Sequence, residues 1–255
     1  MKRISRNGIY FWHFNNLAQE TAIDHFVSDR QSGEKELTLS FGSSPDKEEI
    51  KHNRKLVAEA MGITPDKLVL PSQVHLTRIV HVTHDTSKES LLDTDALISN
   101  EKGICIAVMS ADCVPILLYD KCNHAVGAVH SGWRGTVAGI LAKTLAKMNE
   151  TFGTRGEDIV AGIGPSVSQE SYEVGGEVIA EVERAFGNDS GLMIKKPNDK
   201  AQLDLWQANK IQLRDFGVPD DQIEISDLCT VKNNQHFFSA RKGDAGRFAA
   251  GIMLR

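Results

Sequence analysis

Three residues of types that bind transition metals stand at the ends of apolar segments: His75, Cys113 and His130. Two imidazole nitrogens and one thiolate form a ligand set that suits Zn²⁺, and Cu²⁺ also binds such groups. Three protein ligands leave the fourth position of a tetrahedral zinc open, as in catalytic rather than structural sites. An open zinc can bind water and lower its pKa towards neutrality. The residue types therefore predict a catalytic metal centre.

The spacing of these residues does not decide whether they share a site. They are separated by 38 and 17 residues, more than the local spacing of a zinc finger, so only the fold could assemble them. A single buried cysteine usually packs as a small hydrophobic side chain, and a histidine at a strand end usually forms ordinary hydrogen bonds. From the residues alone, a shared metal site and three separate structural roles both stay open.

The segment Gly132-Trp133-Arg134-Gly135 follows a predicted strand and precedes a predicted helix. The first N–H groups of such a helix and its dipole attract anions. Arg134 could add a bidentate contact to a phosphate or a carboxylate, and the glycines let the backbone approach a ligand closely. An ordinary turn, with Trp133 in the core and Arg134 in solvent, is an equally good interpretation.

The elements that must position these residues alternate along the chain. A helix is expected from Ser44, with its hydroxyl as the cap and Pro45 at the first helical position, to Met61 before Gly62. Three further helices are expected, each ending at a glycine: 135–153, 174–187 and 203–217. Apolar or alternating runs predict the strands, which are 36–41, 67–75 with a break at Pro71, 77–83, 103–109, 114–120, 124–130, 158–165, 222–230, 236–241 and 247–255.

This order of elements predicts an α+β (mixed α/β) fold. Some neighbouring strands are only a few residues apart and should form antiparallel hairpins, because a parallel crossover needs a dozen or more residues. We therefore expect mixed β-sheets flanked by helices rather than a pure doubly wound sheet. No linker, repeat or low-complexity tract divides the sequence, so residues 1–255 are expected to form a single domain.

The composition narrows the range of partners. The net charge of −5 lacks the basic excess of a nucleic-acid-binding protein, so no nucleic acid partner is expected. No apolar run could cross a membrane, and no secretory signal follows the N-terminus. Four cysteines without a C-x-x-C pair predict reduced thiols and a cytoplasmic location. Nothing in the sequence indicates an obligate protein partner.

Seven motifs occur in a characteristic order over about residues 65 to 255: "PSQVH", "TDALIS", "SADCVPILLYD", "AVGAVHSGWRG", "AGIGPSVSQESYEVG", "LDLWQANKIQL" and "FFSARKGDAGR". Together they closely resemble the purine nucleoside phosphorylase family, also called the laccase-domain or polyphenol oxidoreductase family. The resemblance implies a zinc-binding, cytoplasmic, single-domain protein with α/β/β/α-like layers, similar to the fold of cytotoxic necrotizing factor toxins.

The resemblance also implies an activity and a site. Family members phosphorolyse adenosine, inosine or methylthioadenosine to the base and ribose 1-phosphate, and they deaminate adenosine. Their metal ligands match His75, Cys113 and His130. We expect an anion site near Arg134, together with Arg241, to position phosphate for attack on the anomeric carbon. Asp112 is expected to orient a ligand or shuttle a proton, unless it only caps its turn.

Three other functions are compatible with some of these residues. A cysteine hydrolase would use Cys113 as nucleophile and His130 as base, and tightly bound zinc would count against it. A copper-dependent polyphenol oxidase is disfavoured because the nine histidines include no His-x-His pair. A non-catalytic metal-binding protein would have a closed set of ligands, and the sequence offers no convincing fourth one.

Overall fold

The computed structural model describes residues 1–33, 35–188 and 190–255, and it contains two six-stranded sheets that face each other. The strands of the first sheet are, in spatial order, β1 (Lys2–Arg6), β2 (Ile9–His13), β3 (Ile23–Ser28), β17 (Phe248–Leu254), β9 (Cys105–Ser110) and β6 (Leu68–Val69). Those of the second are β16 (Ile223–Ile225), β12 (Ile159–Ile163), β10 (Val114–Asp120), β11 (Ala125–Ser131), β8 (Ala96–Ser99) and β7 (Ile79–His81). The pairs β6–β9, β7–β8 and β12–β16 are parallel and the others antiparallel, which confirms mixed sheets.

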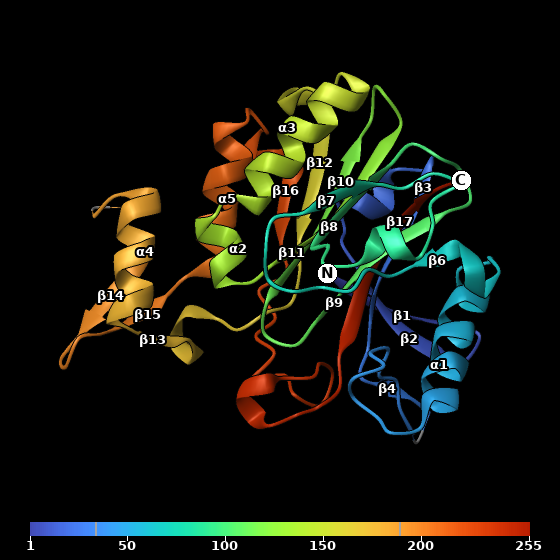
Figure 1. Cartoon of the computed structure of the whole chain (residues 1–255), viewed down its shortest axis with the longest axis horizontal. Helices are drawn as coiled ribbons and strands as arrows, with labels where there is room; N and C mark the ends of the chain where they lie inside the picture. The colour runs from blue at the N-terminus through green and yellow to red at the C-terminus, as the bar shows by residue number, and fades with distance from the viewer. Residues whose placement is uncertain (34, 189) are drawn as a thin grey trace.

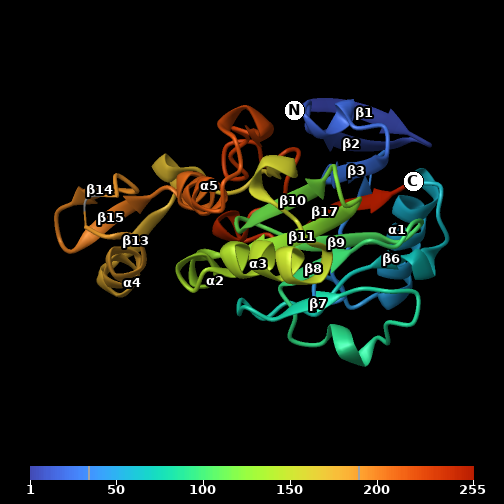
Figure 2. The same ribbon diagram turned by 90° about the horizontal axis from the view of Figure 1, so that it is seen from above.

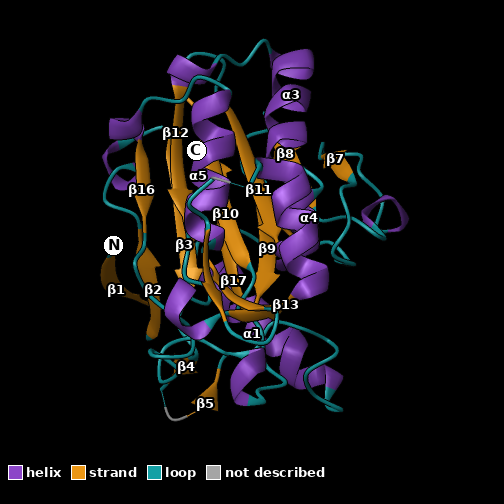
Figure 3. Cartoon of the chain, turned by 90° about the vertical axis from the view of Figure 1, so that its left-hand side faces the viewer, coloured by secondary structure: helices purple, strands orange, loops and turns teal. Residues whose placement is uncertain are grey.

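Apolar side chains form one core between the sheets and one on each outer face. Ile106 of β9 and Leu117 of β10 belong to the cluster between the sheets. Helices α3 (Ile140–Phe152) and α5 (Leu205–Asp215) pack on the outer face of the second sheet, and Figure 3 shows them in front of its strands. Helix α1 (Lys47–Ala60) covers the outer face of the first sheet (Figure 1). These are the α/β/β/α layers that we expected.

A smaller unit projects beyond α5, as Figures 1 and 2 both show. It consists of helix α4 (Gly176–Phe186) and a three-stranded sheet of β13 (Glu173–Gly175), β15 (Lys200–Leu203) and β14 (Met193–Lys196). Its apolar residues, such as Val182 and Leu203, continue the core around α5. In the described part of the chain, no helix has the length and apolar character needed to span a membrane.

The prediction that strands only a few residues apart form hairpins is wrong for β9 and β10. The two strands are only a few residues apart, yet they belong to different sheets and form no hairpin. Both carry large apolar side chains into the space between the sheets, so they face each other instead of pairing. The turn is closed by Ser110, whose Oγ donates to the carbonyl of Cys113 at 2.6 Å. Cys113 therefore lies where the chain crosses between the sheets. The hairpin of β10 and β11 forms as predicted.

Two predicted strands are absent. Of residues 36–41, only Glu36 is in a strand, because β5 (Lys35–Glu36) pairs with β4 (Gln31–Ser32) and ends there. The alternation that predicted this strand instead reflects Leu37 and Leu39, which are buried in the core beside α1. Residues 236–241 form a turn and the start of a 3-10 helix over Ala240–Lys242, and they bury two consecutive phenylalanines there.

Two predicted helices differ from the observed ones: one is divided into two helices, and the other has a different N-cap. The segment 135–153 is divided into α2 (Trp133–Val137) and α3, because Gly139 between them has a left-handed φ of 72°. The cap of α1 is Asp46 rather than Ser44: its carboxylate accepts hydrogen bonds from the N–H groups of Glu48 and Glu49. A carboxylate at this position also interacts favourably with the helix dipole.

Candidate metal centre

The structure brings His75, Cys113 and His130 together from three separate elements. His75 lies in the loop after β6, Cys113 at the crossing between the sheets and His130 near the end of β11. Their ligand atoms all lie within 4.8 Å of one another. The two imidazole rings meet edge to face, with centroids 4.9 Å apart. His130 is buried and His75 is exposed, so the group is accessible from one side.

The backbone at this site has unusual conformations that bring the side chains together. His75 has a φ of 64° and Asp112 a φ of 84°, in the left-handed region that non-glycine residues rarely adopt. A Cβ atom at Gly132 would lie 2.9 Å from Sγ of Cys113 and 3.2 Å from Cδ2 of His75. Glycine is therefore needed at position 132 for the close approach of the backbone to the three side chains.

The buried carboxylate of Asp95, which sequence reasoning missed, connects the two histidines. It lies 2.8 Å from Nδ1 of His130, and it accepts hydrogen bonds from the N–H groups of His75 and Leu76, both at 2.9 Å. Pairing through Nδ1 leaves Nε2 as the nitrogen of His130 that is available to a metal. Asp95 lies inside the "TDALIS" motif, and this position was the signal in the sequence that could have identified it.

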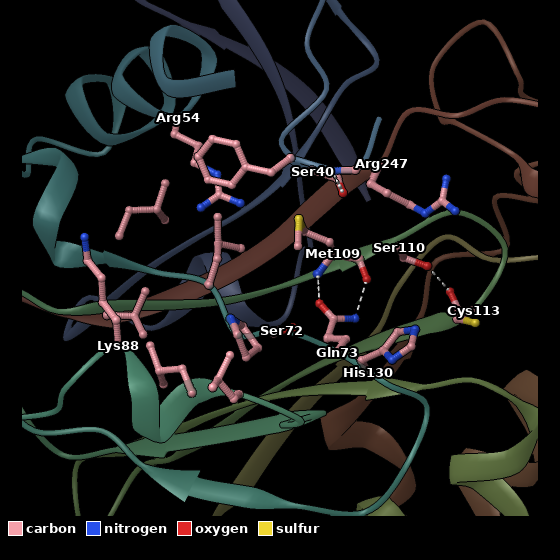
Figure 4. A pocket seen from close by; sticks show the side chains of 18 of the residues that line it. Ser40, Arg54, Ser72, Gln73, Lys88, Met109, Ser110, Cys113, His130 and Arg247 are labelled. Carbon is pink, nitrogen blue, oxygen red and sulfur yellow. Dashed lines mark hydrogen bonds between the residues drawn. The ribbon is translucent and has the colours of Figure 1, made fainter. Parts of the chain in front are cut away.

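Gln73 fixes the loop that carries His75 to the first sheet. Its side-chain N–H donates to the carbonyl of Met109 at 2.8 Å, and its side-chain oxygen accepts from the N–H of Met109 at 2.7 Å (Figure 4). The amide thus pairs with β9 as a neighbouring strand would. This contact holds the loop close to the crossing that carries Cys113.

Charges within the group shift two pKa values in opposite directions. Burial raises the pKa of the Cys113 thiol, but the charge of His130 and hydrogen bonds with both imidazoles lower it more, to below its usual range. Burial lowers the pKa of His130, but the Cys113 thiolate and Asp95 raise it above its usual range. Both shifts favour a thiolate beside an imidazolium in the metal-free pair. The thiolate is the form of cysteine that binds metals and attacks electrophiles.

These three side chains fit a metal ion. The thiolate forms readily, and a histidine ligand whose second nitrogen is bound by a carboxylate is a common arrangement at zinc sites. The ligand atoms of a tetrahedral zinc lie about 3.3–3.8 Å apart, so a group within 4.8 Å needs only a small contraction. Among the described residues, no other group of three His, Cys, Asp or Glu side chains is close enough to hold a metal.

Asp112 and Arg241 lie beside the group and are joined to each other. One carboxylate oxygen of Asp112 accepts from the hydroxyl of Thr230 at 2.5 Å, and the other accepts from the backbone N–H of Arg241 at 2.8 Å. The Arg241 guanidinium lies over the ring of Tyr172, 4.7 Å from its centroid, and donates to the carbonyl of Glu173 at 2.9 Å. Both oxygens of Asp112 are thus engaged in holding the loop of Arg241.

Arg134 lines a smaller pocket of about 170 Å³ beside the group, together with Tyr172. Its guanidinium stacks on Trp133, 4.2 Å from the ring centroid, and its side chain is 59% exposed with Glu177 at 3.8 Å. Helix α2 has only five residues, so its dipole is weak. Any anion binding at this pocket therefore depends on the Arg134 side chain. His75, Asp112 and Cys113 line both this pocket and the main cavity.

The main cavity has a volume of about 1190 Å³, and the three candidate ligands stand at one end of it. Figure 4 shows Cys113 and His130 at this end. Arg54 of α1, which sequence reasoning did not single out, also lines the cavity. It stacks on Phe41 at 4.2 Å, and burial lowers its pKa to about 10. A helical arginine gives no local signal of the cavity that it faces.

The two facing mixed sheets and the His-Cys-His group between them define an α/β/β/α protein with a candidate metal centre. Residues 24–255 match the family described as multi-copper polyphenol oxidoreductase laccase, and the chain belongs to this family.

Relatives of the chain carry names from purine chemistry. A purine nucleoside phosphorylase of Bacteroides thetaiotaomicron is 40% identical over 256 residues, covering 94% of this chain and 95% of the relative. An adenosine deaminase called RL5, from an unknown prokaryotic organism, is 36% identical over 209 residues, covering 78% and 79%. The crystal structure of YlmD from Geobacillus stearothermophilus superposes with a TM-score of 0.89 at 26% identity, covering 99% and 98%. The predicted family and fold are thereby confirmed.

Proposed function

We propose that this protein is a zinc-dependent purine nucleoside phosphorylase that also deaminates adenosine. The convergence of His75, Cys113 and His130 at the end of a large cavity carries the proposal. Relatives named purine nucleoside phosphorylase and adenosine deaminase support the same chemistry. The substrates are adenosine, inosine or methylthioadenosine together with phosphate, and neither nucleic acid nor an obligate protein partner is involved.

His75, Cys113 and His130 would hold the zinc ion, with Asp95 orienting His130. Bound there, zinc would supply a Lewis acid to an oxygen atom in the cavity. The thiolate ligand needs a reducing environment, and all four cysteines of the described chain are free thiols, which supports a cytoplasmic location. Cu²⁺ is the alternative metal at the same ligands.

The chain's own residues would position phosphate and sugar for phosphorolysis. Arg134 and Arg241 line the two pockets that adjoin the group, and both guanidinium groups suit a phosphate. A phosphate oxygen forms the new bond to the anomeric carbon while the bond from that carbon to the purine nitrogen breaks. The purine leaves with the electron pair and takes up a proton. Asp112 would act as a positioning residue, because it holds the backbone of Arg241.

The test is a product assay on purified protein of known metal content. Adenosine and phosphate should give free purine base, adenine with some hypoxanthine, and ribose 1-phosphate in equal amounts, and adenosine alone should give inosine. Removing phosphate should abolish the first pair of products and leave the deamination. The proposal would be contradicted if inosine were the sole product under all conditions, or if phosphorolysis persisted in fully metal-free protein.

A cysteine hydrolase remains a second candidate, because one observation favours it. The lowered pKa of Cys113 and the raised pKa of His130 describe a thiolate–imidazolium pair, which is the reactive form in cysteine nucleophiles. An alkylating reagent should then label Cys113 faster than the exposed Cys122, and an acyl substrate should trap it. Protection of Cys113 by bound metal would favour the phosphorylase.

A further inference from the structure

The main cavity is positively charged, although the chain as a whole is acidic. Among the described residues, six cationic side chains and two carboxylates line it, a net charge of +4, whereas the whole chain has −5. The cations are Lys51, Arg54, Lys67, Lys88, Arg241 and Arg247, and the carboxylates are Asp66 and Asp112. A cleft lined by one sign of charge attracts ligands of the opposite sign. A nucleoside is neutral and leaves most of this charge unused.

Most of these cations are not neutralised within the protein. Lys51 pairs with Glu48. In the described parts of the chain, none of the other five forms an ion pair, and the side chain of Lys88 has no hydrogen bond either. Nζ of Lys67 lies 3.2 Å from Nδ1 of His84, whose Nε2 is 3.3 Å from a carboxylate oxygen of Glu101. The lysines at positions 67 and 88 are therefore available to an anionic ligand.

These two lysines lie away from the metal centre, at what we call the distal end of the cavity. Lys67 directly precedes β6, where Leu68 pairs with Cys105 at the start of β9, whereas Cys113 follows the other end of β9. Figure 4 shows Lys88 on the opposite side of the cavity from Cys113 and His130. The volume of about 1190 Å³ exceeds the 300–1,000 Å³ of most small-molecule sites. There is room for a ligand that extends beyond a nucleoside.

We propose that this cavity binds purine nucleotides, with the nucleoside beside the metal centre and the 5′-phosphate chain at Lys67 and Lys88. The position of the nucleoside rests on the proposed function, whereas the position of the phosphates rests on the charges of the cavity. Lysine ammonium groups are mobile point charges and suit a flexible phosphate chain. His84, held by Glu101, stands beside Lys67 and can share in the contact. Among the described residues, Asp66 is the carboxylate that lines this end; Glu89 interacts with Lys88 but does not line the cavity.

Calorimetric titration of the metal-containing protein with adenosine, AMP, ADP and pyrophosphate tests this inference. ADP should bind about 10- to 150-fold more tightly than adenosine, since a contact to a charged group contributes about 1.5–3 kcal/mol. The advantage should shrink at high ionic strength. In the double variant Lys67→Ala/Lys88→Ala, ADP should bind no more tightly than adenosine. Lys67→Arg/Lys88→Arg should keep the advantage, and Lys143→Ala on the exposed face of α3 should change neither affinity.

Other outcomes would overturn the inference or separate it from the proposed function. Equal affinities for ADP and adenosine in the wild-type protein would refute it. Pyrophosphate binding as tightly as ADP would assign the distal end to free phosphates. An ADP advantage that survives the double alanine variant but disappears when the metal is removed would place the phosphates on the metal. If adenosine is not phosphorolysed while lysine-dependent ADP binding persists, the proposed function fails and the distal anion site stands.

Discussion

Two pairs of histidines in this protein have similar spacing, but the pKa of His130 in one pair is raised and the pKa values of both members of the other pair are lowered. In the metal centre, the rings of His75 and His130 lie 4.9 Å apart, and the pKa of His130 is raised. Between β2 and β3, the rings of His13 and His25 lie 4.5 Å apart, and their pKa values are lowered to about 4 and about 3. The first pair faces a cavity, whereas the second lies within the first sheet and among the described residues leaves Nε2 of His13 without a partner.

The neighbours of each pair explain the difference. Burial lowers the pKa in both places, and a second charge then decides the outcome. At the metal centre, Asp95 and the Cys113 thiolate stabilise the protonated ring of His130. At the other pair, Asp24 is held by two hydrogen bonds from Arg6, at 2.7 and 3.0 Å, and this guanidinium opposes protonation. Residue type and proximity alone therefore do not distinguish a metal site from a packed structural pair.

Cys113→Ser should produce the largest effect, because it removes the thiolate from the group. We expect metal content to fall from one ion per chain to near zero. Phosphorolysis should fall by at least about 100-fold, since a Lewis acid contributes several kcal/mol to catalysis. Elemental analysis and the ribose 1-phosphate assay measure the two effects.

Cys122→Ser is the matched control for this variant. Cys122 is exposed on the turn after β10 and hydrogen-bonds to Asp158 rather than to a histidine. It should keep full metal content and activity. If Cys113→Ser also kept both, the thiolate would have no part in the site.

Asp95→Asn should have the next largest effect. The amide keeps the size of the side chain but loses the charge that favours protonated His130, and it cannot accept the same set of N–H donors. Loss of such a partner of a histidine ligand costs about 10–100-fold in metal affinity. Competition with a chelating dye measures it, and Asp85→Asn, at an exposed position outside the centre, should leave the affinity unchanged.

Those parts of the fold that depend on local patterns were predictable from the sequence. The apolar runs of β10, β11, β12 and β17 and the glycine-terminated helices α4 and α5 lie where the pattern put them. The strand β1 gave little signal because its sequence KRISR is mostly polar, whereas β2, with the sequence IYFWH, has a strong apolar and aromatic signal that sequence reasoning missed. The separation of β9 and β10 into two sheets could not be predicted, because it depends on which distant strands pair with each of them.

The site also has a part that could be predicted from the sequence and a part that could not. Residue chemistry and the motifs pointed to His75, Cys113 and His130, which the fold assembles. Asp95 acquires its role only through contacts with a loop about 20 residues before it and a strand 35 residues after it. The distal lysines were equally invisible, since a single lysine in a loop is normally a solvated charge. The roles of Asp95 and of the two lysines are therefore visible only from their neighbours in three dimensions.

The pair of His13 and His25 should make the protein acid-sensitive. Their folded-state pKa values lie below the unfolded value of 6.5, so the unfolded chain binds protons first as the pH falls. The stabilisation is fully present above about pH 6.5 and is lost as the pH falls towards 4. From pH 7 to 5.5 we expect a loss of about 1 kcal/mol per imidazole in the free energy of unfolding of metal-free protein. Urea unfolding at both pH values measures this loss, and His13→Gln should reduce it. If the variant loses as much unfolding free energy between pH 7 and 5.5 as the wild type, the pair is excluded as the source of the acid sensitivity.

Gly132→Ala should have the smallest effect and should act only on the metal centre. The backbone φ of −72° suits alanine, so the folded chain is not strained. The new methyl group would meet Sγ of Cys113 at 2.9 Å, however, and must push this side chain or His75 away from its present position. A displaced rotamer costs about 0.5–1.5 kcal/mol, so metal affinity should fall by roughly twofold to tenfold. The urea midpoint of the metal-free protein should stay the same. A large drop in this midpoint with unchanged metal affinity would contradict the prediction. Gly132 would then be a packing residue of the core, like the histidine pair of the first sheet, rather than part of the ligand group.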